Sequence, residues 1–182
     1  MVKEGDKIVN ARTGQVMIFK RTGSGTNGGQ LEIECFNPPS DEREPIHIHP
    51  FQESSNEVIS GRLHFWVNGT EQVIGPGEQI VIPAGVPHRF WNEDDEPAHH
   101  IGRFSPGLNI ASFFETFFAL SRDGKLNKNG IPNFLHVSVI ALAFKDEIRL
   151  STPPWIIQYL TYLLLAPIGR LVGYRATYTS KN

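Results

Sequence analysis

The sequence predicts a mainly β fold, an antiparallel sandwich or barrel over residues 1–108, followed by a helical extension over residues 109–182 packed on it. Two observations predict the β part: apolar and polar residues alternate along short segments, and turn sequences separate these segments. A third observation predicts the extension, because apolar residues recur at helical spacing after Pro106-Gly107. With 182 residues, the chain is long enough for one structural unit with a substantial core.

The strands are predicted from period-two patterns and from the turns between them. Residues 31–35 alternate between apolar and acidic side chains, as expected for a strand with one buried face. Residues 62–67 alternate in the same way, and Asn68-Gly69 then supplies the positive φ angles of a two-residue hairpin turn. Gly75-Pro76-Gly77 makes the next turn, before the strand expected at 79–82.

Three helices are predicted in the extension. The first begins at Ser112, where Ser112-Phe-Phe-Glu115 fits a capping box, and it carries four phenylalanines at helical spacing. The second is expected from about Phe134 to Glu147, and the third begins after Pro153-Pro154. The four phenylalanines of the first helix are Phe113, Phe114, Phe117 and Phe118.

The third helix, Trp155–Leu165, is strongly apolar but ends before Pro167 in this prediction. A membrane-spanning helix needs about 20 apolar residues, so this segment is too short to cross a bilayer. Packing against the barrel, a dimer contact and a shallow interfacial helix all fit its apolar pattern. The whole extension is equally compatible with a lid over the barrel mouth, a dimer interface or a surface for a partner.

The charge balance and the cysteine content limit the partners and the location that we expect for the chain. Seventeen Lys+Arg stand against 19 Asp+Glu, so the chain lacks the basic excess that phosphate binding needs, and no nucleic-acid partner is expected. The N-terminal residues carry no apolar signal core, and the single cysteine, Cys35, has no partner for an internal disulfide. The expected location is therefore cytoplasmic, and no transmembrane segment is expected.

The residues that carry chemistry are three histidines. In His47-Ile48-His49 the two imidazoles lie two residues apart, so a strand places both on one face. His88 follows the turn formed around Pro83 and Gly85, and it starts a strand that places Phe90 and Asn92 on its own face. Imidazole suits Fe, Mn, Ni and Zn, so these histidines are candidate ligands of one divalent metal ion of unknown identity.

The two histidine segments resemble the two motifs of the cupin superfamily. The second motif is matched at every defining position by Gly77-x5-Pro83-x-Gly85-x2-His88-x3-Asn92. The first motif, Gly-x5-His-x-His-x3or4-Glu-x6-Gly, is matched by His47, His49 and the closing Gly61. The resemblance covers residues 43–105, about a third of the chain. The chain resembles small single-domain cupins with a conserved barrel, to which it adds a helical C-terminal extension.

The first motif departs from the family at its carboxylate. Counting back from Gly61, the glutamate position is Ser54, and the opening glycine position is Asp41. Glu53 lies one residue early, so its side chain points to the other barrel face unless the strand carries a bulge. Two interpretations of Ser54 remain: it holds a water or a substrate oxygen where the carboxylate would lie, or it is a small residue left after the ligand was lost.

The resemblance implies a double-stranded β-helix, or jelly roll, with a metal in the barrel mouth and dimeric assembly. It also implies that three histidines without a carboxylate are sufficient for iron in a subset similar to the thiol and diketone dioxygenases. Three neutral ligands leave the metal its full positive charge, which favours an anionic, chelating small molecule. Ser54, Phe90, Asn92 and Arg103 are the candidate substrate-binding residues, Arg103 only if it faces inward, where it would clamp a carboxylate.

The other histidines have structural interpretations. His64 lies opposite the apolar face of its strand, and His136 lies in a predicted helix as a surface or packing residue. His99 and His100 are adjacent in a strand, so they point to opposite faces and only one of them can face the barrel interior.

Two hypotheses from different classes follow. In the first, the chain is a small metalloenzyme, similar to a three-histidine dioxygenase or an isomerase, with open metal positions for a substrate. In the second, it is a non-catalytic cupin that binds a small molecule or only dimerises, and its metal site is vestigial. The retained imidazoles favour the first hypothesis, and the missing carboxylate favours the second.

Overall fold

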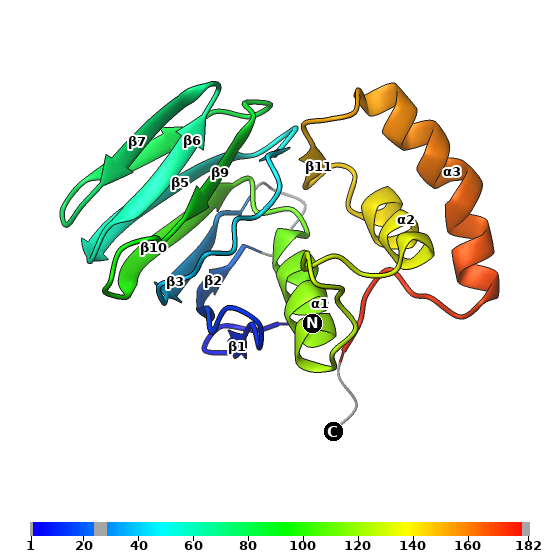
Figure 1. Cartoon of the computed structure of the whole chain (residues 1–182), viewed down its shortest axis with the longest axis horizontal. Coiled ribbons are helices and arrows are strands. Elements are labelled where there is room, and N and C mark those ends of the chain that lie inside the picture. The colour runs from blue at the N-terminus through cyan, green and yellow to red at the C-terminus, as the bar shows by residue number, and fades with distance from the viewer. Residues whose placement is uncertain (1, 24–28, 180–182) are drawn as a thin grey trace.

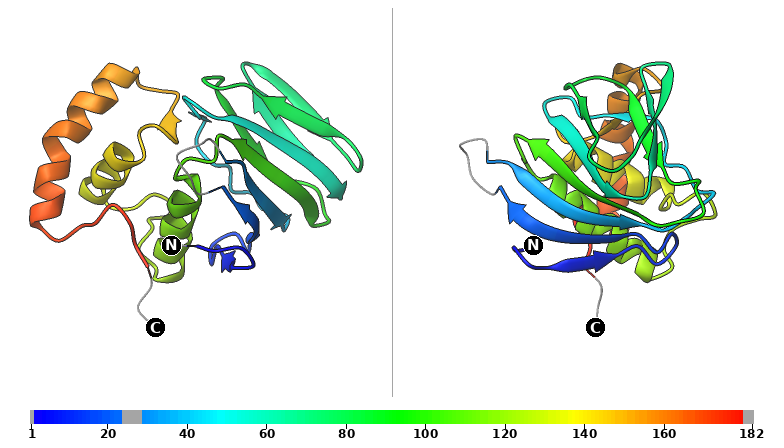
Figure 2. Two further views of the ribbon diagram at one scale, coloured as in Figure 1. Left: turned by 180° about the vertical axis from the view of Figure 1, so that it is seen from behind. Right: turned by 90° about the vertical axis from the view of Figure 1, so that its left-hand side faces the viewer.

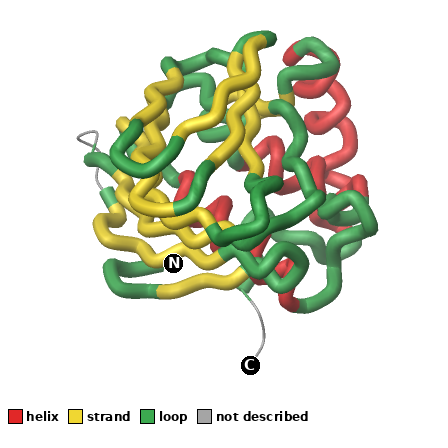
Figure 3. The backbone as a smooth tube through the Cα atoms, turned by 60° about the vertical axis from the view of Figure 1, so that its left-hand side comes forward, coloured by secondary structure: helices red, strands yellow, loops and turns green. Residues whose placement is uncertain are grey.

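The computed structural model describes residues 2–23 and 29–179. Two antiparallel β-sheets face each other, and three helices lie together at one side of them (Figure 1). Figure 3 shows the same division, with the helices in red gathered on one side of the yellow strands. The predicted jelly-roll fold with a C-terminal helical extension is confirmed.

In the described residues the larger sheet has six strands, and its strand at 31–37 carries the predicted alternation, with Leu31, Ile33 and Cys35 buried. The right-hand view of Figure 2 shows how its strands sweep across the molecule. In spatial order the strands are β1 (Lys7–Val9), β2 (Val16–Thr22), β3 (Leu31–Asn37), β10 (Ala98–Ser105), β5 (Glu53–Ser60) and β8 (Gln79–Ile82).

The smaller sheet has five strands and carries two of the candidate ligands. Asn68 and Gly69 both have positive φ angles, 48° and 92°, and join two of its strands, which confirms the predicted hairpin. In spatial order the strands are β11 (Arg149–Leu150), β4 (His47–Ile48), β9 (His88–Trp91), β6 (Leu63–Val67) and β7 (Thr70–Ile74).

Apolar side chains from both sheets meet in the barrel interior. Phe65 and Leu63 of β6 are fully buried there with Val58 of β5. Cys35 lies in a second cluster between the larger sheet and α1 (Ile110–Arg122). Burial raises the pKa of the Cys35 thiol to about 12, so the thiol is a core residue and not a nucleophile.

The helices differ from the sequence prediction at their ends. α1 begins at Ile110 after Asn109, so Ser112 lies inside the helix and caps nothing, and the predicted capping box is wrong. α2 spans Phe134–Ala143 and ends before Glu147, because the chain turns there to form β11. The apolar pattern alone could not show that a short strand pairs with β4 at this point.

α3 spans Trp155–Leu171 and continues through Pro167, where the sequence predicted its end. Pro167 is exposed, so the carbonyl group that loses its helical partner lies on the solvent side of the helix. Among the described residues, no helix combines the length and the apolar character that crossing a bilayer requires.

The extension is attached to the barrel at two places. α1 packs against the larger sheet, and β11 adds a strand to the smaller sheet, with Leu150 paired to His47. α2 then lies between the barrel and α3, and α3 is the outermost element on that side (Figures 1 and 2). The two helices approach closely at Gly169, where a Cβ atom would lie 2.7 Å from the Leu135 carbonyl oxygen.

Candidate metal centre

The strand pairing brings the three histidines to one place. His47 of β4 and His88 of β9 are direct partners across an antiparallel pair, so their side chains leave the sheet on the same face. His49 follows His47 by two residues and therefore shares that face. Two segments that lie about 40 residues apart in the sequence thus deliver three imidazoles to the barrel interior.

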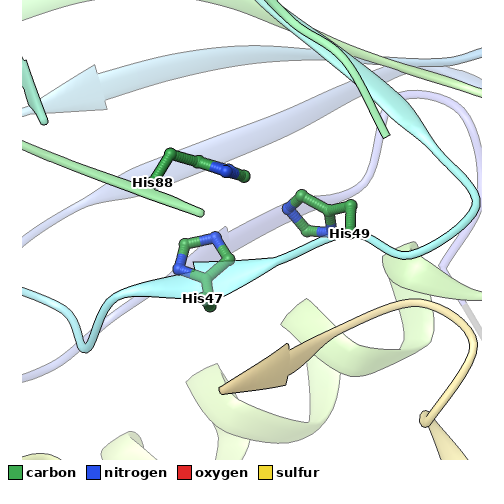
Figure 4. Close-up of side chains that lie close together, drawn as sticks. All are labelled: His47, His49 and His88. Atoms are coloured by element: carbon green, nitrogen blue, oxygen red, sulfur yellow. The ribbon is translucent and has the colours of Figure 1, made fainter. Parts of the chain in front are cut away.

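The three rings point toward one another (Figure 4). One nitrogen of each ring lies within 4.8 Å of one nitrogen of each of the other two rings. The ring centroids are 4.5 Å apart for His47 and His88, 5.1 Å for His47 and His49, and 5.3 Å for His49 and His88. All three residues are buried. Three convergent nitrogens at this spacing could hold one metal ion as an open, three-ligand set.

Hydrogen bonds fix which nitrogen of each ring is free. Nδ1 of His47 lies 3.0 Å from the Pro45 carbonyl oxygen, and Nδ1 of His88 lies 2.8 Å from that of Val86. Nδ1 of His49 lies 2.7 Å from the carbonyl oxygen of Glu147. Because a carbonyl oxygen only accepts, each Nδ1 carries the proton and donates it. Each neutral ring therefore keeps the lone pair of Nε2 for a metal ion.

The electrostatics keep the rings neutral. Burial lowers the pKa of His47 and of His88 to about 4. The pKa of His49 lies well below its usual value, first through burial and then through its two imidazole neighbours. A metal ligand must be deprotonated at Nε2, and near pH 7 these rings already are.

The residues around the missing carboxylate lie on β5, in the opposite sheet. Ser54 is buried and lines the cavity that contains the histidines. Glu53 pairs with Ser105 in regular register and is exposed, so the structure does not bring it into the cluster. The register of β5 against β10 does shift, but at His99 and His100, opposite the far end of β5. The bulge that Glu53 would need is therefore absent at Glu53.

A cavity of about 380 Å³ lies between the barrel mouth and the helices. The three histidines and Ser54 lie on its barrel side, whereas the extension contributes mainly apolar side chains. These volumes and linings are typical of sites for small organic molecules. The apolar side chains from the extension are Phe113, Phe114, Phe117, Phe118, Ile131, Val137, Ile140, Ala141, Ile148, Leu150, Trp155 and Tyr162.

The other predicted substrate-binding residues separate into two groups. Phe90 and Asn92 line the cavity, although Asn92 uses its amide to hold the Asn37 and Glu96 carbonyls, each at 2.8 Å. Arg103 lies on the outer face of β10, where it forms ion pairs of 2.9 Å with Glu32 and with Glu57. The condition set for Arg103 as a carboxylate clamp, an inward side chain, is not met.

Sequence reasoning missed three contributors to the site. His100 lines the cavity, its Nε2 lies 3.0 Å from Asn37 Oδ1, and its buried Nδ1 has no partner among the described residues. Glu44 also lines the cavity, with a carboxylate oxygen 4.0 Å from His47 Nδ1. The third is the backbone carbonyl group of Glu147, which accepts the hydrogen bond from His49. A pattern of side chains cannot reveal a contact made by the backbone.

The remaining histidines lie outside the cluster. His64 is on the outer face of β6, near Glu93 and Asp94. His99 is on the outer face of β10, 3.0 Å from Glu34. His136 is buried between α2 and the C-terminal segment, where its ring stacks on Tyr174 and its Nε2 lies 3.1 Å from the Arg175 carbonyl oxygen.

Comparison with known proteins identifies relatives of the chain. An oxidoreductase of Arthrobotrys oligospora is 26% identical over 151 residues, which are 75% of this chain and 58% of that protein. The quercetin 2,3-dioxygenase of Bacillus subtilis is 25% identical over 115 residues, which are 63% of this chain and 32% of that protein. The chain thus spans between a third and three fifths of the length of these two curated relatives.

A solved structure and a family model also match the chain. An RmlC-like cupin from Shewanella frigidimarina superposes with a TM-score of 0.47 at 20% identity, over 61% of this chain and 93% of that one. Residues 36–101 match the family model of the cupin domain, and this range contains all three histidines. Residues 36–101 therefore form a cupin domain within the longer chain.

Proposed function

We propose that the chain binds a divalent metal ion through Nε2 of His47, His49 and His88, and holds an apolar organic molecule with an anionic or chelating group over it. The observation that carries this proposal is the set of three Nδ1 bonds to carbonyl oxygens, which leaves three Nε2 atoms free. A vestigial cluster has no reason to keep all three rings oriented in this way.

The metal would act as a Lewis acid with open positions on the cavity side. Among the described residues, the group placed to hold the ion contains three neutral imidazoles and no carboxylate, so its ligands add no negative charge; Glu44 lies beside His47 on the Nδ1 side of that ring. An anionic oxygen of the ligand is therefore the favoured occupant of an open position. The phenylalanines of α1 and Ile140 of α2 give the rest of the ligand an apolar environment.

The chemistry proposed for the site is oxidation of the bound molecule by dioxygen. The supporting observation is that two relatives carry the names oxidoreductase and quercetin 2,3-dioxygenase. In this proposal the apolar cavity-lining side chains of the extension keep water out, and the ligand is held between Ser54 and the imidazoles. The alternative is a module that binds metal and ligand without turnover.

Metal binding is tested by titrating untagged, chelator-treated protein with Mn²⁺, Fe²⁺, Ni²⁺ and Zn²⁺ and measuring stoichiometry by calorimetry and elemental analysis. We expect one metal per chain, and an affinity loss of more than about 100-fold in His88→Ala, because a ligand contributes more than the groups that orient it. His64→Ala removes an imidazole from the outer face and serves as the matched control.

Turnover is tested separately with an oxygen electrode, using the metal-loaded protein and a flavonol as a probe of the apolar, chelating class. Dioxygen uptake that is abolished in His88→Ala and retained in His64→Ala would support oxidation of the bound molecule by dioxygen. Stoichiometric metal and flavonol binding without uptake would favour the binding module. A wild-type protein that takes up no metal, with an unchanged melting temperature in its presence, would refute both versions.

A further inference from the structure

The outer face of α3 is an unusual surface. Its inner face is buried against α2 through Gln158, Tyr162, Ala166 and Gly169. The outer face is also apolar, and eight of the 17 large hydrophobic residues exposed in the described part of the chain lie between residues 156 and 172. Such residues are normally scattered singly over a surface, so this concentration indicates a contact. The eight are Ile156, Ile157, Leu160, Leu163, Leu164, Ile168, Leu171 and Val172.

The apolar residues form one stripe. At 3.6 residues per turn, the exposed side chains from Ile156 to Leu171 fall within an arc of about 140°. Leu164 and Leu171 in this arc are 71% and 86% exposed. Tyr159 and Arg170 flank one side of the arc, and no charged residue lies inside it. Figure 1 shows α3 as the outermost helix, and the exposure of these side chains places the stripe on its outer side.

The charge around the stripe has one sign. The chain as a whole carries two more acidic than basic residues, yet no Asp or Glu follows Glu147. The charged residues in the described chain beyond that point are Arg149, Arg170 and Arg175, and the last two are exposed. Tyr159 flanks the stripe on the same side as Arg170. Trp and Tyr favour the boundary between water and lipid.

These charges fit a second copy of the chain poorly. In an antiparallel pair of α3 helices, Arg170 of each copy would meet the N-terminal turn of the other, which has no acidic residue and carries the positive end of the helix dipole. In a parallel pair the two Arg170 side chains would meet each other. Neither arrangement supplies an anion, whereas an anionic lipid surface supplies anions beside an apolar layer.

We propose that the outer face of α3 binds peripherally to an anionic lipid surface, with the helix lying in the plane of the interface. The aliphatic stripe enters the boundary between head groups and acyl chains, and Arg170 and Arg175 contact the lipid phosphates. This proposal is independent of the metal site, because the stripe and the cavity lie on opposite faces of α3.

The test is co-sedimentation of the full chain with vesicles of phosphatidylcholine alone and of phosphatidylcholine mixed with phosphatidylglycerol. We expect binding to the mixed vesicles and loss of at least about tenfold in affinity for Leu164→Glu, which places a charge in the stripe. Val81→Glu is the matched control, because Val81 is 51% exposed on β8. Arg170→Gln should lose roughly fivefold for the anionic vesicles only.

Circular dichroism establishes that each variant is folded, and Leu171→Glu replaces Leu164→Glu if the latter is not. The proposal is overturned if the wild type binds neither kind of vesicle, or if Val81→Glu lowers binding as much as the stripe variants. It is also overturned if sedimentation velocity shows a dimer that Leu164→Glu separates while vesicle binding is absent, because a second copy would then cover the stripe.

Discussion

The two parts of the chain hold the three imidazoles in different ways. His47 and His88 donate their Nδ1 protons to carbonyl groups two residues earlier, so the barrel alone orients them. His49 donates to Glu147, which lies 98 residues later in the extension. The barrel therefore contains a complete set of rings but orients only two of them itself. The third ring depends on a segment that lies outside residues 36–101, the range that matches the cupin domain.

This difference gives the extension a definite position in the site. Ile148, Arg149 and Leu150 follow Glu147 directly, line the cavity and, in part, pair with β4. The carboxylate of Glu147 accepts a hydrogen bond of 3.3 Å from the backbone N–H of Asn109, next to the start of α1. One residue thus connects the first helix to His49. A simple appendage would make no such contact, so we expect the two parts to unfold together.

The largest expected effect tests whether the two parts unfold together. Phe65→Ala in the barrel core should lower the free energy of unfolding by about 3–5 kcal/mol, and Ile140→Ala in α2 by about 2–5 kcal/mol. Both side chains are almost completely buried, with 0% and 1% exposure. Denaturant unfolding followed by tryptophan fluorescence and by far-ultraviolet circular dichroism should give one shared transition for each protein. Two separated transitions would show that barrel and extension are independent.

The barrel was the more predictable part, for a physical reason. Alternation along a strand follows directly from backbone geometry, so the patterns at 31–35 and 62–67 fixed which side chains face inward. The same parity put His47 and His49 on one face and separated His100 from Arg103. Strand pairing was not visible in this way, yet it is what places His88 opposite His47.

The extension was less predictable because helical periodicity does not reveal what a helix packs against. The four phenylalanines of α1 were assigned to a helix correctly, but nothing in their spacing showed that they line a cavity. β11 has only two residues, which is too short for a strand pattern to be detected. The Glu147 carbonyl group was beyond sequence reasoning altogether, since every residue has one.

A second prediction concerns the pH dependence of stability that His100 causes on the barrel side of the cavity. His100 is buried on the barrel side, and burial lowers its pKa to about 3. An unfolded histidine gains a proton below about pH 6.5, whereas folded His100 stays neutral, so the unfolded state binds more protons as the pH falls. Between pH 7 and pH 5, His100 alone should lower the free energy of unfolding by about 2 kcal/mol.

The matched variant is His100→Gln, which keeps a donor for Asn37 Oδ1 and removes the titrating group. The metal-free wild type also contains His47, His49 and His88, whose lowered pKa values act in the same direction in both proteins. Denaturant unfolding at pH 7 and pH 5 should therefore show the wild type losing about 2 kcal/mol more than the variant. Equal losses would show that His100 is not neutral in the folded protein.

A third prediction weakens the contact between the extension and His49. Glu147→Ala removes the acceptor for the Asn109 N–H and leaves the carbonyl group that holds His49 less firmly placed. We expect metal affinity to fall roughly tenfold, as for other groups that orient a metal-binding histidine. Glu147→Gln keeps an acceptor oxygen and should bind metal like the wild type. Competition with a chelator measures both, and an unchanged affinity in Glu147→Ala would show that the barrel orients His49 without the extension.

The smallest expected effect concerns Ser54, the barrel residue that faces the imidazoles from the opposite sheet. Ser54→Glu restores a carboxylate where the family motif has one, and it should tighten metal binding by up to roughly tenfold if the cluster is a working site. The same negative charge should weaken binding of the flavonol probe, because it reduces the positive charge that attracts an anionic oxygen. Val81→Glu adds the same charge on an exposed position of the neighbouring strand and should change neither affinity. The opposite signs are the decisive result, since a variant that merely disturbs the cavity would weaken metal and flavonol binding together.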